Sequence, residues 1–269
     1  MAEENGSVGQ NRAWQVIKHL LGVEDGKGAL RAVLEPLAII AITFASTTAI
    51  AQPFYVPSGS MQPTLAIGDA FIAAKYPYGY SRYSVPFAFG PASSTRLLQK
   101  LPQQGDVVVF RLPRDPSQTY IKRVIGLPGD KIQMIAGRLW INGKELALRP
   151  DGQGKVESED GTFSDSPRFI ETLPNGKTHP IYKWTWTGQL DDTQEFVVPA
   201  GHLFMMGDNR DNSLDSRVPA DDGGVGFVPA ENLVGRAEFV VGSYDFLNAH
   251  AIWTWVTEFR LSRFFNGVS

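Results

Sequence analysis

The strongest constraint on the fold is a run of apolar residues near the N-terminus. Residues 32–51 read AVLEPLAIIAITFASTTAIA, and a helix needs about 20 such residues to cross a bilayer. Glu35 and Pro36 lie near its start, where a carboxylate can reach the interface and a proline is compatible with a first helical turn. A buried core helix is the alternative. The run predicts one transmembrane helix.

Charges on the two sides of this run indicate its orientation. Lys27 and Arg31 lie just before it, and no Lys or Arg follows it until Lys75. This excess of positive charge predicts that the N-terminus is cytoplasmic. We therefore expect residues 1–31 to form a cytoplasmic tail and everything after Gln52 to be exported. A cleaved signal peptide is the competing interpretation, but the tail before the run is too long for one.

The composition excludes several classes of function. The 269 residues carry a formal net charge of -3, without the basic stripe that nucleic-acid binding requires. The absence of cysteine removes disulfides, thiolate metal sites and cysteine nucleophiles. The 27 glycines and 18 prolines interrupt the sequence too often for a helical bundle and favour many short strands. We expect no cofactor, no metal ion and no nucleic-acid partner.

Strand and turn signals predict a mainly β fold. Residues 105–110 contain a turn and a β-branched strand, and residues 120–125 form the return strand after a proline-bearing turn, which together predict a hairpin. The Asn-Gly pairs at 142–143 and 175–176 are two further hairpin signals. Residues 150–168 are rich in Asp, Gly, Ser and Glu, which predicts a solvated loop.

These signals divide the exported part of the chain into a core and an insertion. We expect an antiparallel β core formed by residues 52–132 and 201–269, and a β-rich cap formed by residues 133–200. The C-terminal stretch, residues 249–269, interleaves aromatic residues with arginines. That mixture is compatible with a membrane interface or with a packed helix.

The stretch PSGSMQPTL at residues 57–65 places two hydroxyls around a glycine shortly after the apolar run. Gly59 permits a backbone conformation that a Cβ would obstruct, and Pro57 and Pro63 fix φ on either side. Such a pre-set backbone can aim the hydroxyl of Ser60. A turn leading into a strand is the alternative, because Ser, Gly and Pro are common turn residues.

A reactive serine needs a group that takes its proton, and the usual acceptor is histidine. None of the four histidines lies in a recognisable motif. Lys122 is the candidate base instead, because Ile121 and Val124 flank it in an apolar strand. Burial there would bring its pKa toward the working pH. A solvent-facing lysine beside Arg123 is the alternative.

The run GDNRDNSLDSR at residues 207–217 predicts a charged turn, a calcium loop or a polar cluster beside an active site. An EF-type loop that starts at Asp208 or Asp211 has no glycine at its sixth position and no glutamate at its twelfth, which excludes the calcium loop. We interpret the charges of this run as pairs that hold it in place, with Ser213 donating a hydroxyl contact to Lys122. These charges are Asp208, Arg210, Asp215 and Arg217.

Taken together, these segments resemble the bacterial type I signal peptidases, membrane-anchored serine proteases that remove signal peptides from exported proteins. Four motifs follow the family's order: PSGSMQPTL, GDVVVF, YIKRVIGLPGDK and GDNRDNSLDSR, at residues 57–65, 105–110, 120–131 and 207–217. The resemblance covers most of the chain between residues 54 and 238. It implies a mainly antiparallel β fold, with a catalytic core and a β-rich cap.

The resemblance also implies a role for each matching residue. Ser60 would be the nucleophile, Lys122 its general base, and Ser213 the hydroxyl that orients Lys122. Ser58 and the backbone N–H of Ser60 would form the oxyanion hole. The residues that match shallow apolar pockets for small side chains, as in Ala-X-Ala cleavage sites, are Phe54, Val56, Met61, Leu65, Val109, Tyr120 and Ile121. The residues that match the family's supporting charges are Asp208, Asp215 and Arg217.

The function expected from this resemblance is a Ser/Lys endopeptidase that cleaves preproteins on the outer, periplasmic face of the bacterial inner membrane. Its partners would be signal-peptide-bearing preproteins and membrane lipids. Two alternatives stay open: a specialised peptidase dedicated to one conjugation or secretion substrate, and a non-catalytic anchored module that grips signal peptides. The joint presence of Ser60, Lys122 and Ser213 argues against the module, because a binder has no need of a buried base.

Overall fold

The computed structural model describes residues 26–84, 96–244 and 259–268 of the chain. The chain divides into two compact units, Met1–Thr47 and Thr48–Ser269. Most of the expected tail (residues 1–31) and half of the aromatic C-terminal stretch (residues 249–269) therefore lie outside the described residues.

Most of the predicted apolar helix, α2 (Gly26–Ala49), belongs to the first unit. Its segment Leu30–Thr47 has a mean hydropathy of 1.5, and none of that segment is buried within the protein. The 24 residues of α2 extend over about 36 Å, which exceeds the hydrocarbon thickness of a bilayer. The helix begins earlier than the predicted span, so Pro36 lies inside it and not in its first turn.

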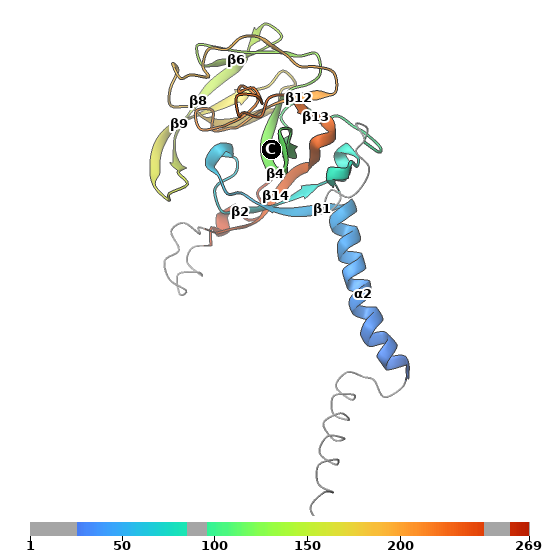
Figure 1. Cartoon of the computed structure of the whole chain (residues 1–269). Helices are drawn as coiled ribbons and strands as arrows, with labels where there is room; N and C mark the ends of the chain where they lie inside the picture. Colours follow the sequence, from blue (N-terminus) through green and yellow to red (C-terminus); the bar gives the residue numbers. More distant parts are fainter. Residues whose placement is uncertain (1–25, 85–95, 245–258, 269) are drawn as a thin grey trace, which may run out of the picture. The chain divides into compact units, whose positions relative to one another are not determined.

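The second unit is built on a seven-stranded antiparallel sheet, with the strand order β1-β2-β14-β3-β4-β12-β13 (Figure 1). The bounds are β1 Ala51–Tyr55, β2 Asp69–Ala74, β3 Val107–Leu112, β4 Asp115–Gly126, β12 His202–Met206, β13 Val228–Pro229 and β14 Leu233–Ser243. Strands β3 and β4 form the predicted hairpin, in which Val108 lies opposite Lys122. The β1–β2 connection, β4 and the segment after β12 carry the motifs of Ser60, Lys122 and Ser213, and β3 carries the fourth motif.

The predicted cap consists of two smaller antiparallel sheets, ordered β11-β5-β6-β7 and β10-β9-β8. The bounds are β5 Lys131–Ile135, β6 Arg138–Ile141, β7 Lys144–Glu145, β8 Ala147–Glu157, β9 Phe163–Thr172, β10 Thr178–Tyr182 and β11 Phe196–Val197. Asn142 and Gly143 both have positive φ, 53° and 76°, as a two-residue hairpin turn requires. The Asn-Gly pair at 175–176 lies between β9 and β10, which pair as a second hairpin. Both predicted turns are confirmed.

The prediction of a solvated loop at residues 150–168 is wrong. Most of this segment belongs to the hairpin of β8 and β9, and only residues 158–162 form its turn. Many of its polar side chains are exposed on the ribbon, while the main chains pair across it. Composition therefore indicated the exposure of this segment correctly but not its backbone structure.

The cap and the large sheet share one hydrophobic cluster. It joins residues of β4 and β12 to residues of the cap sheets, and Phe204 of β12 is completely buried within it. The ring of Phe204 lies 5.3 Å from that of Phe196 in β11 and 6.1 Å from that of Phe227. Apolar burial of this kind is the main force that holds two layers together. The cap is therefore packed firmly on the core sheet.

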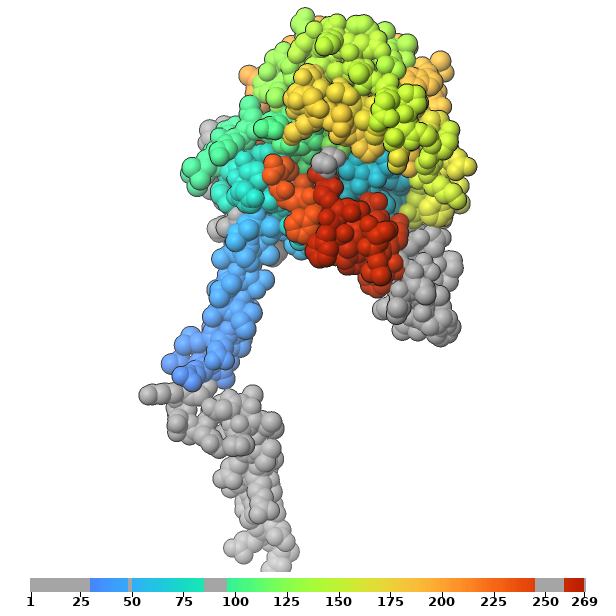
Figure 2. Space-filling model, turned by 180° about the vertical axis from the view of Figure 1, so that it is seen from behind, coloured from blue at the N-terminus to red at the C-terminus, as the bar shows by residue number. Residues whose placement is uncertain are grey.

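The described part of the C-terminal stretch, residues 259–268, lies along β14 (Figure 2). Its backbone bonds to β14 at Glu238 and Val240. Arg263 forms an ion pair of 2.5 Å with the buried Asp69 at the start of β2. Within these residues the only helical segment is a single 3-10 turn, Leu261–Arg263.

Truncating Phe204 should separate the cap from the core. We expect Phe204→Ala to lower the free energy of unfolding by about 3–5 kcal/mol, through lost burial and the cavity left behind. Urea unfolding of the full chain in detergent measures this change. The control is Phe163→Ala, at a phenylalanine in the same unit that is 52% exposed, for which a change within about 0.5 kcal/mol is expected. Equal losses would contradict the assigned role of Phe204.

Candidate active site

Ser60 lies in a 3-10 turn, Gly59–Met61, that follows β1. The segment after β12 holds this turn in place through Asn209. The side-chain amide of Asn209 donates to the carbonyl oxygen of Gly59, and its backbone N–H donates to the carbonyl oxygen of Ser60, both at 3.1 Å. A Cβ at Gly59 would lie 2.8 Å from Nε2 of Gln62 and 3.0 Å from the backbone carbonyl oxygen of Glu157. Glycine is therefore needed here for close packing, and the side chain of Ser60 is only 9% exposed.

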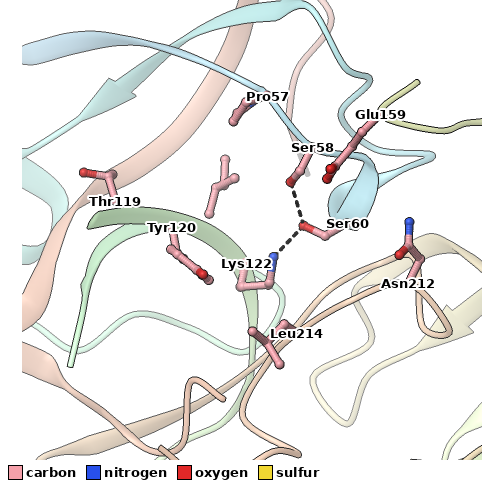
Figure 3. A pocket seen from close by; sticks show the side chains of 10 residues that line it. Pro57, Ser58, Ser60, Thr119, Tyr120, Lys122, Glu159, Asn212 and Leu214 are labelled. Carbon is pink, nitrogen blue, oxygen red and sulfur yellow. Dashed lines mark hydrogen bonds between the residues drawn. The ribbon is translucent and has the colours of Figure 1, made fainter. Parts of the chain in front are cut away.

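Lys122 projects from β4 directly to this serine. Its Nζ donates to Oγ of Ser60 at 2.5 Å, across 62 residues of sequence (Figure 3). Burial lowers the pKa of Lys122 from 10.5 to about 8, although the carboxylates of Asp215 and Asp208 favour its charged form. Arg217 acts in the same direction as burial. A large fraction of this amine is therefore neutral near pH 8 and able to accept a proton.

Ser58 lies at the other side of the Ser60 hydroxyl. The two Oγ atoms are 3.4 Å apart, and either can be the donor (Figure 3). A hydroxyl in this place can donate to an oxygen that develops negative charge beside Ser60. Ser58 and Ser60 both line the cavity described below.

Ser213 is buried beside Ser60, but no hydrogen bond joins it to Lys122 among the described residues. It packs against Gly207, where an added Cβ would lie 2.5 Å from Cβ of Ser213 and 2.5 Å from the carbonyl oxygen of Ser60. The role of Ser213 in orienting Lys122 stays a prediction.

The four charges expected to pair within residues 207–217 form only one pair inside that segment. Arg217 Nε donates to Asp215 at 2.9 Å. Asp208 pairs with Arg123 of β4 at 2.7 Å, and Arg210 pairs with Glu171 of β9 through two hydrogen bonds of 2.8 and 2.5 Å. The segment is therefore tied to the core sheet and to the cap.

These pairs keep buried carboxylates ionised. Burial raises the pKa of Asp208, but Arg123 and the hydroxyl of Thr64 outweigh it and hold the pKa below its ordinary value. The same balance, with Arg210 as the partner, lowers the pKa of Glu171. All four side chains of these two pairs are at least 97% buried.

His179 completes this charge cluster without contacting Ser60. Its Nε2 lies 3.4 Å from Glu171 and 3.9 Å from Asp208. Burial, together with the charge of Arg123, lowers its pKa to about 4, so the ring is neutral at pH 7. Neither His179 nor His202 lines the cavity at Ser60, which leaves Lys122 as the nearest basic group among the described residues.

A cavity of about 380 Å³ opens at the serine and lysine (Figure 3). Tyr120 and Ile121 are the two predicted substrate-binding residues that line it. Four of the other predicted residues are buried in the hydrophobic cluster that supports the turn: Val56, Met61, Leu65 and Val109, each at most 1% exposed. The fifth, Phe54, is partly buried and packs against this cluster.

One edge of β4 is open beside this cavity. Strand β12 pairs with β4 only between Arg123 and Gly126, so residues 119–122 have no partner strand on that side within the described residues. Pro57 and Ser58 lie across the cavity from them. Such an edge can accept an extended peptide as an additional strand. Within the described residues, no group of three or more acidic or histidine side chains could hold a metal ion.

The sequence matches the protein family described as signal peptidase, peptidase S26, over residues 30–242. The chain belongs to the signal peptidase family. Signal peptidase I of Rickettsia akari (strain Hartford) is 43% identical over 209 residues, which cover 75% of each chain. Signal peptidase I of Rickettsia typhi (strain ATCC VR-144 / Wilmington) is 39% identical over 249 residues, covering 86% of this chain and 90% of the relative.

A crystal structure of a signal peptidase I from Enterococcus faecalis V583 is 27% identical, covers 51% of this chain and 97% of that chain, and superposes with a TM-score of 0.30. Family membership confirms the resemblance inferred from the four motifs and assigns peptidase activity to the chain. With its apolar helix α2, the chain is consistent with a membrane-anchored peptidase.

Sequence reasoning missed three residues of the charge cluster: Arg123, Glu171 and His179. A signal existed for Arg123, since an arginine in an apolar strand requires a buried partner. Glu171 and His179 gave none, because polar residues in a hairpin are usually solvated and their partners lie in distant segments.

Adding a methyl group at Gly207 should displace Ser60. We expect Gly207→Ala to lower kcat/KM for a cleaved peptide by at least about tenfold, because a shift of about 1 Å at a catalytic group has effects of that order or more. Peptide cleavage assays measure the loss. Gly242→Ala, where a Cβ meets nothing closer than 3.9 Å, is the matched control, and an equal loss in both variants would contradict the prediction.

Proposed function

We propose that the chain is a membrane-anchored serine endopeptidase that removes signal peptides by a Ser60/Lys122 acyl-enzyme mechanism. The observation that carries this proposal is the 2.5 Å contact between Lys122 Nζ and Ser60 Oγ in a buried setting. A lysine that is neutral near working pH can take the proton of a serine hydroxyl, as histidine does in other serine peptidases.

In the proposed reaction, Ser60 Oγ attacks the scissile carbonyl carbon while its proton passes to neutral Lys122. The carbonyl oxygen becomes an oxyanion, which the backbone N–H of Ser60 and the hydroxyl of Ser58 stabilise. Lys122 then gives the proton to the leaving amine as the C–N bond breaks, which leaves an acyl-enzyme ester. Water attacks this ester with Lys122 again as base, releasing the new carboxyl terminus and restoring Ser60.

The substrate segment before the scissile bond would pair with the open edge of β4 at residues 119–121. Main-chain hydrogen bonds then supply affinity, and side-chain pockets supply specificity. The wall formed by Tyr120 and Ile121, supported from beneath by the buried cluster, favours small side chains such as those of Ala-X-Ala sites. The predicted roles of Phe54, Val56, Met61, Leu65 and Val109 would then be to shape these pockets from below.

The proposed location is the bacterial inner membrane, with the N-terminus cytoplasmic and the peptidase unit on the periplasmic face. The charge bias around α2 supports this orientation. Preproteins whose signal peptides are held in the same membrane would be the substrates, and lipids would surround α2, whose apolar side chains are exposed.

Removing either member of the dyad should abolish cleavage. We expect Ser60→Ala and Lys122→Ala each to lower kcat for a preprotein by about 10⁴-fold or more, because members of a nucleophile–base pair act as a unit. Gel assays in detergent, with N-terminal sequencing of the product, measure the loss. Ser117→Ala and Lys144→Ala, at exposed positions, are matched controls that should cleave normally.

Two outcomes of this assay would contradict the proposal. Normal cleavage by Lys122→Ala would exclude Lys122 as the base, and binding of the preprotein by the wild type without cleavage would favour a signal-peptide-binding module. A panel of unrelated preproteins separates a general peptidase from a specialised one, since only the former cuts them all.

The pH profile should follow the titration of Lys122. Because the neutral amine is the active form, kcat/KM should rise with pH and level off above about pH 8. The carboxylate of Asp215 stabilises the ammonium and raises this pKa, so Asp215→Asn should move the inflection to lower pH. Peptide cleavage assays over about two pH units on either side of the Lys122 pKa of about 8 measure the shift.

The control for the profile is Asp221→Asn, which removes an exposed carboxylate and should leave the inflection unchanged. An inflection that stays in place or rises in the Asp215 variant would show that Lys122 is not the group that titrates.

A further inference from the structure

The tip of the β8–β9 hairpin is anchored beside the nucleophile. The amide of Gln62 donates to the carbonyl of Glu157 at 2.8 Å and accepts from the N–H of Glu157 at 3.0 Å. Gln62 follows Ser60 by two residues and is 4% exposed. The tip, residues 158–162, is therefore tied to the segment of Ser60 through the side chain of Gln62 and the backbone of Glu157.

Glu159 extends from this tip to the wall of the active-site cavity (Figure 3). Its side chain is exposed, and among the described residues it has no hydrogen-bond or ion-pair partner. Of the ten residues that line the cavity, only Lys122 and Glu159 are basic or acidic. Since Lys122 must be neutral to act as base, Glu159 supplies the fixed charge of the reaction-ready cavity.

The position of Glu159 indicates which part of a substrate it faces. Figure 3 shows Thr119 and Tyr120 on one side of Ser60, and Glu159 with Asn212 on the other. In the proposed function, the substrate residues before the scissile bond lie along residues 119–121. The chain that follows the scissile bond must then leave on the side of Glu159.

We propose that Glu159 is a specificity-determining residue that disfavours acidic and favours basic side chains in the first two residues after the scissile bond. This inference rests on the proposed function and deepens it. An acidic side chain there would bring two negative charges together in a partly enclosed cavity, whereas a basic one would give Glu159 the partner it lacks. Exported proteins whose mature chains begin with neutral or basic residues would be the preferred substrates.

The effect of Glu159 is separable from the chemistry of the dyad. The charges that shift the pKa of Lys122 are those of Asp215, Asp208 and Arg217, and Glu159 is not among them. The hairpin is anchored through the backbone of residue 157, so exchanging the side chain at position 159 removes no contact that holds the tip.

The test uses three peptides that are identical up to an Ala-X-Ala site and carry Lys, Gln or Glu as the first residue after it. The ratio of kcat/KM for the Lys peptide to that for the Glu peptide is measured for the full chain in detergent. The wild type should give a ratio of about two to five, the range of exposed charge pairs. Glu159→Gln should bring the ratio to about one, and Glu159→Lys should invert it.

The control is Asp165→Asn, which removes an exposed charge from the same hairpin outside the cavity and should keep the wild-type ratio. Raising the salt concentration from 0.05 to 0.5 M should reduce the wild-type ratio through screening, since the Debye length is about 10 Å at 0.1 M. A wild-type Lys-to-Glu ratio that is lower at high salt than at low salt supports a direct charge effect.

Two results would overturn the inference. A Lys-to-Glu ratio that is the same in the wild type and in Glu159→Lys excludes charge selection, and an equal loss on all three peptides in both Glu159 variants assigns a structural role instead. Failure of the wild type to cut any of the three peptides would reject the proposed function itself. Efficient cleavage of all three peptides with equal kcat/KM rejects only the role of Glu159.

Discussion

The burial of Lys122 against Ser60 is the constraint on which the rest of the site depends. A lysine in this position loses hydration, and this loss lowers its pKa to about 8 and makes the amine available as a base. The same burial requires that the other buried charges nearby be paired. The core sheet provides the burial, since β4 places Lys122 opposite Val108 and leaves it only 4% exposed. The segment after β12 provides the paired charges.

The ion pairs of that segment connect three parts of the second unit. Asp208 pairs with Arg123 on the core sheet, and Arg210 pairs with Glu171 in the cap. Removing one partner of such a buried pair generally costs about 3–5 kcal/mol, because it leaves an uncompensated charge. Since Asn209, between the two, holds the backbone of Ser60, the position of the nucleophile depends on the cap as well as on the core.

Local signals in the sequence were sufficient for most of the fold. The apolar helix, the β3–β4 hairpin and both Asn-Gly turns are each specified by residues close together in the chain, and the structure contains all of them. The β8–β9 hairpin was missed because its stability lies in cross-strand pairing. Ser60 and Lys122 could be proposed as a pair from the chemistry of their motifs, and the family resemblance strengthened that pairing. The partner Glu171 could not be found, because 39 residues separate it from Arg210.

The main chain and one side chain of the β8–β9 hairpin have separate roles. Its main chain at residue 157 bonds to Gln62 and is required for the fold around Ser60. Its side chain at Glu159 makes no contact that the described fold needs, yet it lies on the cavity wall. Selectivity after the scissile bond can therefore change by substitution at one position without disturbing the dyad. A cap that were only a structural support would have no reason to extend an unpaired charge toward the nucleophile.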